Sequence, residues 1–185
     1  MSLVPSMVNH LDGNTLMEEK QFWSIIEAHG TDSSGDADEQ LDSVRNELLK
    51  LSPAEVQDFD RLFNQKRDDA YIWDLWGAAY LINGGCSDDA FHYFRAWLIS
   101  QGRAVYYAAV ANPDTLAGLT DPERDDYEFE SLGYVALEVY EQLTGSEMPH
   151  DDIRAPSVAK GENWDFEDDD EVIRHLPKLG RVYLD

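Results

Sequence analysis

The sequence YIWDLWGAAYLI, residues 71–82, is apolar on nearly every side when it is wound as a helix. A helix of that kind belongs inside a bundle, because a surface helix keeps one polar face. The small residues at 77–79 let a neighbouring helix approach closely. Asn83, Gly84 and Gly85 follow, and glycine adopts the left-handed backbone geometry at which helices commonly end. This stretch therefore predicts the central helix of a helical core.

Upstream of this stretch, apolar side chains recur at helical spacing in residues 18–29 and again in residues 41–51. A third helix is predicted to start at Pro53, since proline suits the first helical position. Ser52 can cap that helix, and Glu55 completes a capping box. The upstream half of the chain therefore contributes three helices.

Two upstream segments lack this spacing. Residues 30–38 are rich in Gly, Ser and Asp, which favours a flexible connection. The first fifteen residues are polar and unpatterned. We therefore assign residues 1–17 to an extension that precedes the folded domain.

Downstream, Ser87 is predicted to cap a helix whose apolar stripe contains Phe91, and a further helix covers residues 105–110. Asn112 and Pro113 end it. Asp121 and Pro122 resemble a second cap with a first-turn proline, so a long helix is expected after them, with its buried positions at Leu132, Val135, Val139 and Leu143.

The last forty residues show less pattern. Residues 145–161 read as a loop, and the apolar side chains between 172 and 183 predict a short helix and an extended tail docked on the body. No alternating segment of the kind that sheets need is present. The predicted fold is all-α: one irregular bundle of about six to eight helices, with the domain at 18–145 and the acidic loop and tail at 146–185.

Length and composition limit the class of protein. One domain is the expected organisation for 185 residues, and 43% hydrophobic residues supply a real core. The lone cysteine, Cys86, cannot form an internal disulfide, which favours a reducing compartment. No apolar run reaches the roughly 18 residues that a membrane span needs. We therefore expect a cytoplasmic protein.

The charge is the most unusual bulk property. The chain has 14 basic and 38 acidic residues, with a formal net charge of -24. Such a surface repels phosphate backbones and anionic lipids, so we expect no binding to nucleic acid and none to membranes. It can steer a basic partner protein, although many acidic proteins carry such charge for solubility alone.

Five short blocks resemble a known family. They are FW at 22–23, WGAAY at 76–80, GGCSDDAF at 84–91, YFRAWLI at 93–99 and GR at 102–103. These blocks resemble the bacterial family catalogued as domain of unknown function four-two-four-zero, over roughly residues 18–145. The resemblance implies a bacterial source and a helical domain, and it implies no established activity. The acidic C-terminal part lies outside it.

Common catalytic and cofactor motifs are absent from the sequence. It contains no glycine-rich nucleotide loop, no HExxH, no CxxC and no nucleophile elbow. The histidines are scattered, at His10, His29, His92, His150 and His175, so no local metal cluster can form. We therefore expect no cofactor and no metal, we assign no catalytic residue, and we favour a non-enzymatic role.

The helix after Ser87 carries the best candidate ligand site. Asp88, His92 and Arg95 share one stripe at helical spacing, and the carboxylate four residues away can raise the pKa of His92. With Asp89 and Arg103, this stripe can line a polar pocket for an anionic ligand. The alternative is structural: Asp88 and Asp89 stabilise the helix dipole, and Arg95 bridges to another helix.

Two further features have structural alternatives. Cys86 precedes a helix N-terminus, where the pKa of a thiol can fall, although a lone cysteine without a histidine partner is usually inert. The aromatic side chains of residues 73–97 have the shape of a cage, but their helical spacing favours core packing.

The acidic run 162–171 carries the candidate partner site. Two aromatic side chains lie within it, and such a mixture can dock on a basic, partly apolar surface. The candidate residues are Trp164, Phe166, Asp168, Asp169 and Asp170. The alternative is a solvated acidic segment.

Two functions remain open. The first is a regulatory or neutralising interaction module that recognises a basic protein. The second is a small-molecule binding domain, or an unusual enzyme, with its pocket around residues 87–103. We favour the interaction module, because the sequence carries a large negative charge and lacks a recognised catalytic motif. The sequence does not indicate the oligomeric state.

Overall fold

The computed structural model describes residues 16–29, 36–124, 126–149 and 156–184. Helices form the regular structure of these ranges, which contain no β-strand, so the predicted all-α fold is confirmed for them. The α-helices are α1 (Glu19–Ile26), α2 (Ala37–Leu48), α3 (Pro53–Asp69), α4 (Trp73–Ile82), α5 (Asp88–Ser100), α6 (Arg103–Ala111), α7 (Val135–Thr144), α8 (Asp169–His175) and α9 (Pro177–Tyr183). The 3-10 helices are η1 (Glu27–His29), η2 (Pro113–Gly118) and η3 (Ser131–Gly133).

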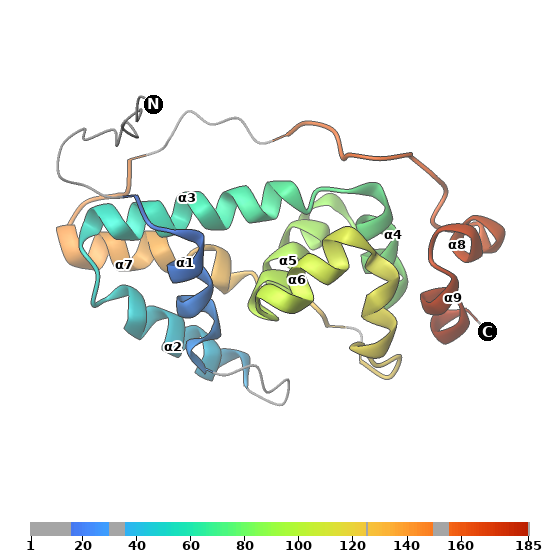
Figure 1. The fold of residues 1–185 in the computed structure, drawn as a ribbon, viewed down its shortest axis with the longest axis horizontal. Helices are drawn as coiled ribbons and strands as arrows, with labels where there is room; N and C mark the ends of the chain where they lie inside the picture. The colour runs from blue at the N-terminus through green and yellow to red at the C-terminus, as the bar shows by residue number, and fades with distance from the viewer. Residues whose placement is uncertain (1–15, 30–35, 125, 150–155, 185) are drawn as a thin grey trace, which may run out of the picture.

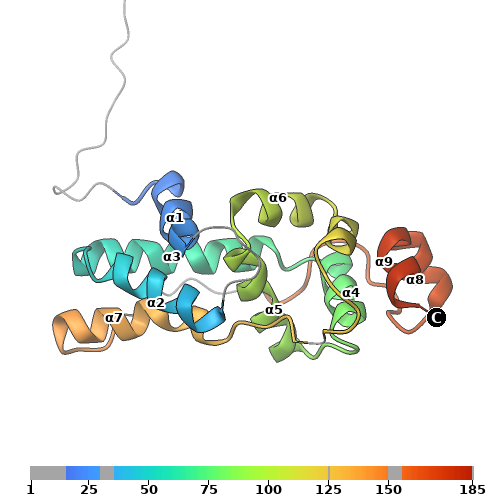
Figure 2. The same cartoon turned by 90° about the horizontal axis from the view of Figure 1, so that it is seen from below.

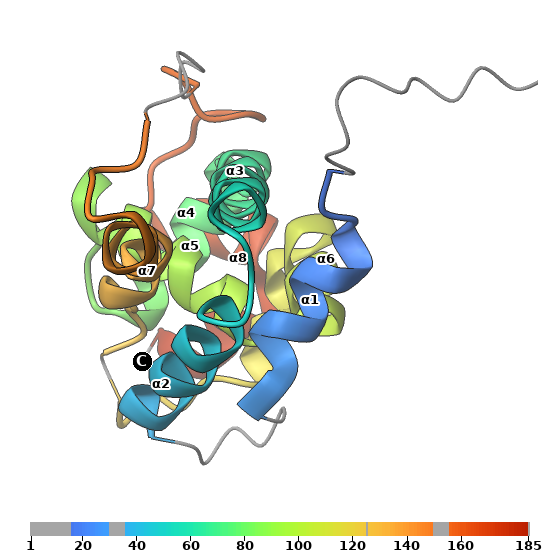
Figure 3. The ribbon, with the colours of Figure 1, turned by 90° about the vertical axis from the view of Figure 1, so that its left-hand side faces the viewer.

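Helix α3 is the longest helix, with 17 residues, and runs along the body beside α7 (Figures 1 and 3). The predicted capping box starts it. Ser52 Oγ accepts from the backbone N–H of Glu55, and Glu55 Oε2 accepts from the backbone N–H of Ser52 at 2.8 Å. Its apolar face, which includes Phe59 and Phe63, is buried. The capping box therefore sets where the main scaffold helix begins.

Helix α4 is central, as its apolar surface predicted. Leu75, Ala78 and Ala79 are fully buried, and the ring of Trp76 stacks on that of Phe91 from α5, with centroids 5.0 Å apart. Of the aromatic side chains of residues 73–97 that were expected in the core, Phe91, Phe94 and Trp97 are buried there. Trp73, Trp76 and Tyr80 are partly buried. The helix has 10 residues, and no helix among the described residues is long and apolar enough to span a bilayer.

The stretch between η2 and α7 corrects one expectation. The long helix expected after Asp121 does not form, and the chain stays irregular until η3. Tertiary contacts compete with the helix: the backbone N–H of Tyr127 donates to Asn83 Oδ1, and that of Phe129 donates to the carbonyl of Tyr93. Both aromatic rings are buried. Side-chain burial therefore outweighs the local helix signal.

The C-terminal part forms two short helices, α8 and α9, where one helix and an extended tail were expected. The described residues hold nine α-helices in all, two of which lie in this C-terminal part. Both helices pack at the end of the body that carries α4, far from α7 (Figures 1 and 2). Val172, Leu176 and Leu179 are fully buried there, so the tail is docked on the body.

The folded domain starts earlier than residue 18. Met17 is 6% exposed, and its backbone N–H donates to Asp58 Oδ2 at 2.9 Å. Met17, which we assigned to the extension, therefore belongs to the core. Residues 1–15, with His10, and the segment 150–155, with His150, lie outside the described residues.

Candidate functional site

Helix α5 begins as the sequence predicted. Ser87 Oγ accepts from the backbone N–H of Ala90 at 3.1 Å, and Asp88 and Asp89 occupy the first turn with exposed side chains. Carboxylates in this position stabilise the helix through its dipole. Neither carboxylate has an ion pair within the described residues. These two residues therefore match the structural alternative.

His92 contacts an arginine that the sequence did not indicate. The Nη1 atom of Arg67 lies 2.6 Å from His92 Nε2, so the imidazole accepts a hydrogen bond there. Burial, followed by the nearby charges of Arg67 and Arg95, lowers the pKa of His92 to about 4. The rise expected from Asp88 does not occur. His92 is therefore neutral near pH 7.

Arg95 is buried, with 7% of its surface exposed. Its Nε donates to the carbonyl of Phe91 at 3.2 Å, and its Nη1 donates to the carbonyl of Arg67 at 2.8 Å. The guanidinium also lies over the rings of Tyr71 and Phe91, 4.8 Å from each centroid. Because Arg67 belongs to the last turn of α3, Arg95 binds the C-terminal end of that helix, where a cation is favoured.

The remaining predicted ligand residue, Arg103, lies apart from this cluster. It is exposed at the start of α6, its backbone N–H donates to Glu27 Oε1, and its guanidinium lies 5.9 Å from the centroid of Tyr107. The structure therefore brings together Arg67, His92 and Arg95, and it leaves Arg103 on another surface.

Cys86 differs from the expectation for a thiol near a helix N-terminus. Burial, and the charge of Glu128, raise its pKa to about 12. The thiol is therefore protonated near pH 7, and it is a poor nucleophile.

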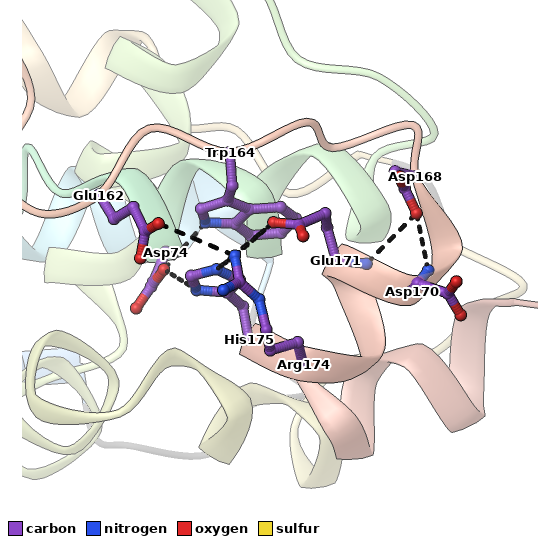
Figure 4. Close-up of polar contacts among 8 residues, drawn as sticks. All are labelled: Asp74, Glu162, Trp164, Asp168, Asp170, Glu171, Arg174 and His175. Atoms are coloured by element: carbon purple, nitrogen blue, oxygen red, sulfur yellow. Dashed lines mark hydrogen bonds and ion pairs between the residues drawn. The ribbon is translucent and has the colours of Figure 1, made fainter.

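The C-terminal segment, residues 156–184, is anchored by Trp164. Its indole is 6% exposed, and Nε1 donates to Asp74 Oδ1 of α4 at 2.9 Å (Figure 4). It lies against Gly77, where a Cβ atom would come within 2.3 Å of Trp164 Cζ2. Trp164 therefore faces the core and is not available to a partner while the segment is docked.

A second side chain of the segment reaches the same carboxylate. His175 Nδ1 lies 2.8 Å from Asp74 Oδ1, and the imidazole stacks on the indole of Trp164 with centroids 4.5 Å apart (Figure 4). Asp74 therefore holds two side chains of the segment at once. Sequence reasoning missed this contact, because Asp74 and His175 are 101 positions apart.

The other candidate partner residues divide between buried and exposed positions. Phe166 is half-buried against the aromatic rings of α4, among them Trp73 at 5.8 Å. Asp168 caps α8, since its Oδ1 accepts from the backbone N–H of Asp170 at 2.9 Å. The side chains of Asp169 and Asp170 are exposed and face solvent.

Comparison with known proteins assigns the family. A family model described as Protein of unknown function (DUF4240) matches residues 17–142, about two thirds of the chain. The chain belongs to this family. The match confirms the predicted resemblance. A search of curated proteins and a search of solved structures found no match.

The DUF4240 match separates the two candidate sites. The cluster of Arg67, His92 and Arg95 lies within it, as do Asp74 and Gly77 of α4. The C-terminal segment follows the matched residues. Among the described residues, no group of three or more His, Cys, Asp or Glu side chains could hold a metal ion. The DUF4240 region thus provides the α4 residues on which the C-terminal segment packs, and the segment itself carries exposed carboxylates.

Proposed function

We propose that this DUF4240 member is an acidic interaction module that binds a basic partner protein through the exposed carboxylates of residues 165–170. The observation that carries the proposal is the state of these side chains. Asp165, Glu167, Asp169 and Asp170 are exposed, and none forms an ion pair within the described residues. A basic surface would find these carboxylates free of competing cations.

Docking of the segment on α4 supports the proposal. Trp164 and Phe166 are turned toward α4, and Tyr80 donates its hydroxyl to Glu167 Oε1 at 2.9 Å. The carboxylates between and after these anchors are held on an ordered backbone. A partner therefore meets a preorganised acidic surface, which lowers the entropic cost of binding. In this proposal the partner contacts the carboxylates and leaves the two aromatic side chains in place.

The test compares two variants with equal changes in charge. The first replaces Asp165, Asp169 and Asp170 with Asn, and it keeps Asp168 because that residue caps α8. The control replaces three exposed carboxylates elsewhere: Asp42→Asn, Glu141→Gln and Glu147→Gln. A low-salt pull-down from the source cells, analysed by mass spectrometry, identifies a retained basic protein, which is then purified and titrated against all three chains.

We expect the first variant to weaken binding about tenfold at low salt, and the control to weaken it little. Wild-type affinity should also fall steeply as ionic strength rises, because exposed charges are screened. Equal losses in both variants would contradict a site at residues 165–170. Binding that does not change with salt would contradict a basic partner altogether.

The Arg67–Arg95 cluster favours a second candidate function, the binding of a small anion. The Arg67 guanidinium contacts neutral His92, and the charge of Arg95 also acts on that imidazole. Neither arginine forms an ion pair with a carboxylate among the described residues. Calorimetric titration with inorganic phosphate tests it. Arg67→Gln should abolish binding and Arg103→Gln should preserve it. No heat of binding with the wild-type chain would exclude phosphate as the ligand.

A further inference from the structure

The C-terminal segment is held by contacts that are specific in shape. Gly77 makes room for the indole of Trp164, and any side chain at position 77 would overlap that ring. Asp74 accepts from the indole, and it also contacts His175 (Figure 4). This part of α4 is therefore complementary to one tryptophan and one histidine, and it would not accept an arbitrary apolar segment.

A second set of contacts lies on η2. Asp114 is 4% exposed, and its carboxylate accepts from the backbone N–H groups of Lys178 at 2.8 Å and of Leu179 at 2.9 Å. It thereby binds the first turn of α9. A buried carboxylate without these donors would carry a large desolvation cost. We call the surface formed by Asp74, Gly77 and Asp114 the docking face.

A short backbone pairing adds to the docking face. The backbone N–H of Trp73 donates to the carbonyl of Lys160, and the N–H of Lys160 donates to the carbonyl of Tyr71, each at 2.9 Å. Backbone donors and acceptors of this kind bind an extended peptide whether or not it belongs to the same chain. The docking face thus offers shape, charge and backbone complementarity to residues 160–179.

The connection between α7 and the C-terminal segment is long enough for the segment to reach the docking face of its own body or that of a second copy of the chain. Fifteen residues separate the end of α7 from Lys160, enough to span about 50 Å when extended. Their described parts, 145–149 and 156–159, contain no helix, and most of their side chains are exposed. The end of α7 and the docking face lie at opposite ends of the molecule (Figures 1 and 2). Among the described residues of this connection, Met148 and Ala159 are buried, and Ala159 belongs to the exchanged residues, so the described part does not tie the segment to its own body.

We propose that the docking face also binds the C-terminal segment of a second copy of the chain, so that two copies exchange residues 156–184. The exchanged dimer has the same docking contacts as the monomer, since each face receives an identical segment. The two states therefore differ mainly in the conformation of the connection and in the entropy of association. The exchange does not depend on a basic partner.

In the wild-type chain, the attached segment competes with any second copy. Because this segment is covalently attached, its effective concentration at its own docking face is in the millimolar range, about 1 mM, which hides exchange at ordinary concentrations. The test therefore removes this competition with two complementary variants. Gly77→Ala keeps the segment but blocks its own docking face, and Trp164→Ala keeps the face but loses the main anchor of its segment.

Each variant alone should run as a monomer of 21.0 kDa in size-exclusion chromatography with light scattering. Their equimolar mixture should form a one-to-one complex of twice that mass well below about 1 mM, because the attached segment of the second variant no longer competes for its own face. The segment of the first variant then occupies the open face of the second. A mixture that stays monomeric, while circular dichroism shows both variants helical, would overturn the proposal.

A second measurement uses unaltered chains. Nitrogen-15-labelled and unlabelled wild-type protein are mixed near 1 mM, the range in which exchange competes with the attached segment. They are then diluted and examined at once by native mass spectrometry. Dimers of mixed isotopic mass are expected. Monomers alone at every concentration and incubation time would contradict exchange, even if either variant failed to fold.

Discussion

At the scale of single residues, two buried polar side chains complete the end of α3. Arg95 donates to the carbonyl of Arg67, and the hydroxyl of Tyr106 donates to the carbonyl of Lys66 at 2.5 Å. The carbonyl of Lys66 also accepts from the backbone N–H of Ala70 at 3.1 Å, so Tyr106 adds a second hydrogen bond there. The last carbonyls of a helix tend to lack a partner within it, and Arg95 supplies such a donor to Arg67. The stripe that suggested a ligand pocket in the sequence is therefore partly a helix cap.

His92 should titrate far below an ordinary histidine. Burial and the neighbouring guanidiniums of Arg67 and Arg95 lower its pKa to about 4 from 6.5. The unfolded chain then binds the proton more readily, so this group's contribution to stability is complete above pH 6.5 and is lost as the pH falls towards 4. Titration of the ring signals by NMR measures the pKa.

Arg67→Gln provides the matched comparison for His92, because it removes the contacting guanidinium and keeps a polar side chain at position 67. The pKa of His92 should rise in this variant. A wild-type pKa near 6.5, or a pKa that Arg67→Gln leaves unaltered, would show that the guanidinium of Arg67 does not lower the pKa of His92.

Glu19 should stabilise the fold only above mildly acidic pH. Its carboxylate accepts from Tyr107 at 2.6 Å and from Lys66 at 3.0 Å, and these contacts lower its pKa from 4.5 to about 2. Glu19→Gln should cost about 1 kcal/mol at pH 7, a modest value because the side chain is 41% exposed. Urea unfolding measures the loss.

The sign of the pH dependence follows from the lowered pKa of Glu19. Stability is present above pH 4.5 and is lost as the pH falls towards 2, so the difference between wild type and Glu19→Gln should shrink over that range. The exposed neighbour Glu18 provides the control, since Glu18→Gln should change little. A difference that stays constant down to pH 2 would argue against the predicted linkage.

At the scale of elements, α4 combines two requirements that conflict at Gly77. Glycine is a poor helix former, about 1 kcal/mol worse than alanine in a helix interior. The docked indole of Trp164 nevertheless leaves no space for a methyl group there. The position therefore favours packing between α4 and the C-terminal segment over the intrinsic stability of the helix.

Gly77→Ala should destabilise the protein although it improves helix propensity. Overpacking of this kind typically costs about 1–3 kcal/mol, and the cost should appear in chemical unfolding and as faster proteolysis within the C-terminal segment. Gly118→Ala in η2 is the control, because a Cβ atom added there would have nothing within 4 Å and the φ of Gly118 is not positive. A more stable Gly77→Ala chain would mean that Trp164 does not occupy this position.

At the scale of the whole molecule, the formal net charge of -24 opposes compaction. The basic side chains do little to offset it. Several of them, such as Arg45 with Glu138 and Lys160 with Asp69, each pair with one carboxylate. Repulsion within the acidic surface therefore lowers the stability of the fold. The same negative charge produces the electrostatic field that, in our proposal, attracts a basic partner protein.

The melting temperature should rise with sodium chloride, since salt screens repulsion between exposed carboxylates. The Debye length falls from about 30 Å at 0.01 M to about 10 Å at 0.1 M, so most of the gain should appear in that range. Calorimetry at both concentrations measures it. The control chain with Asp42→Asn, Glu141→Gln and Glu147→Gln should show a smaller salt effect. A melting temperature independent of salt would mean that repulsion is not significant.

The sequence by itself determined the helices of the DUF4240 region and several of their ends. Apolar spacing, the Ser52–Glu55 capping box and the glycines after α4 act within a few residues, so their signals can be read locally. The same local signals failed after Asp121, where Tyr127 and Phe129 gain more from burial than from a helix.

Only the tertiary structure decided what the polar and aromatic side chains do. Arg67 meets His92 across 25 positions, and Trp164 meets Asp74 across 90. Such contacts depend on how the helices pack after they have formed. The sequence around a residue does not indicate which distant residue it will contact. Helix formation is a short-range preference of the backbone, whereas the docking face arises only when α4 and η2 are packed together in the folded body.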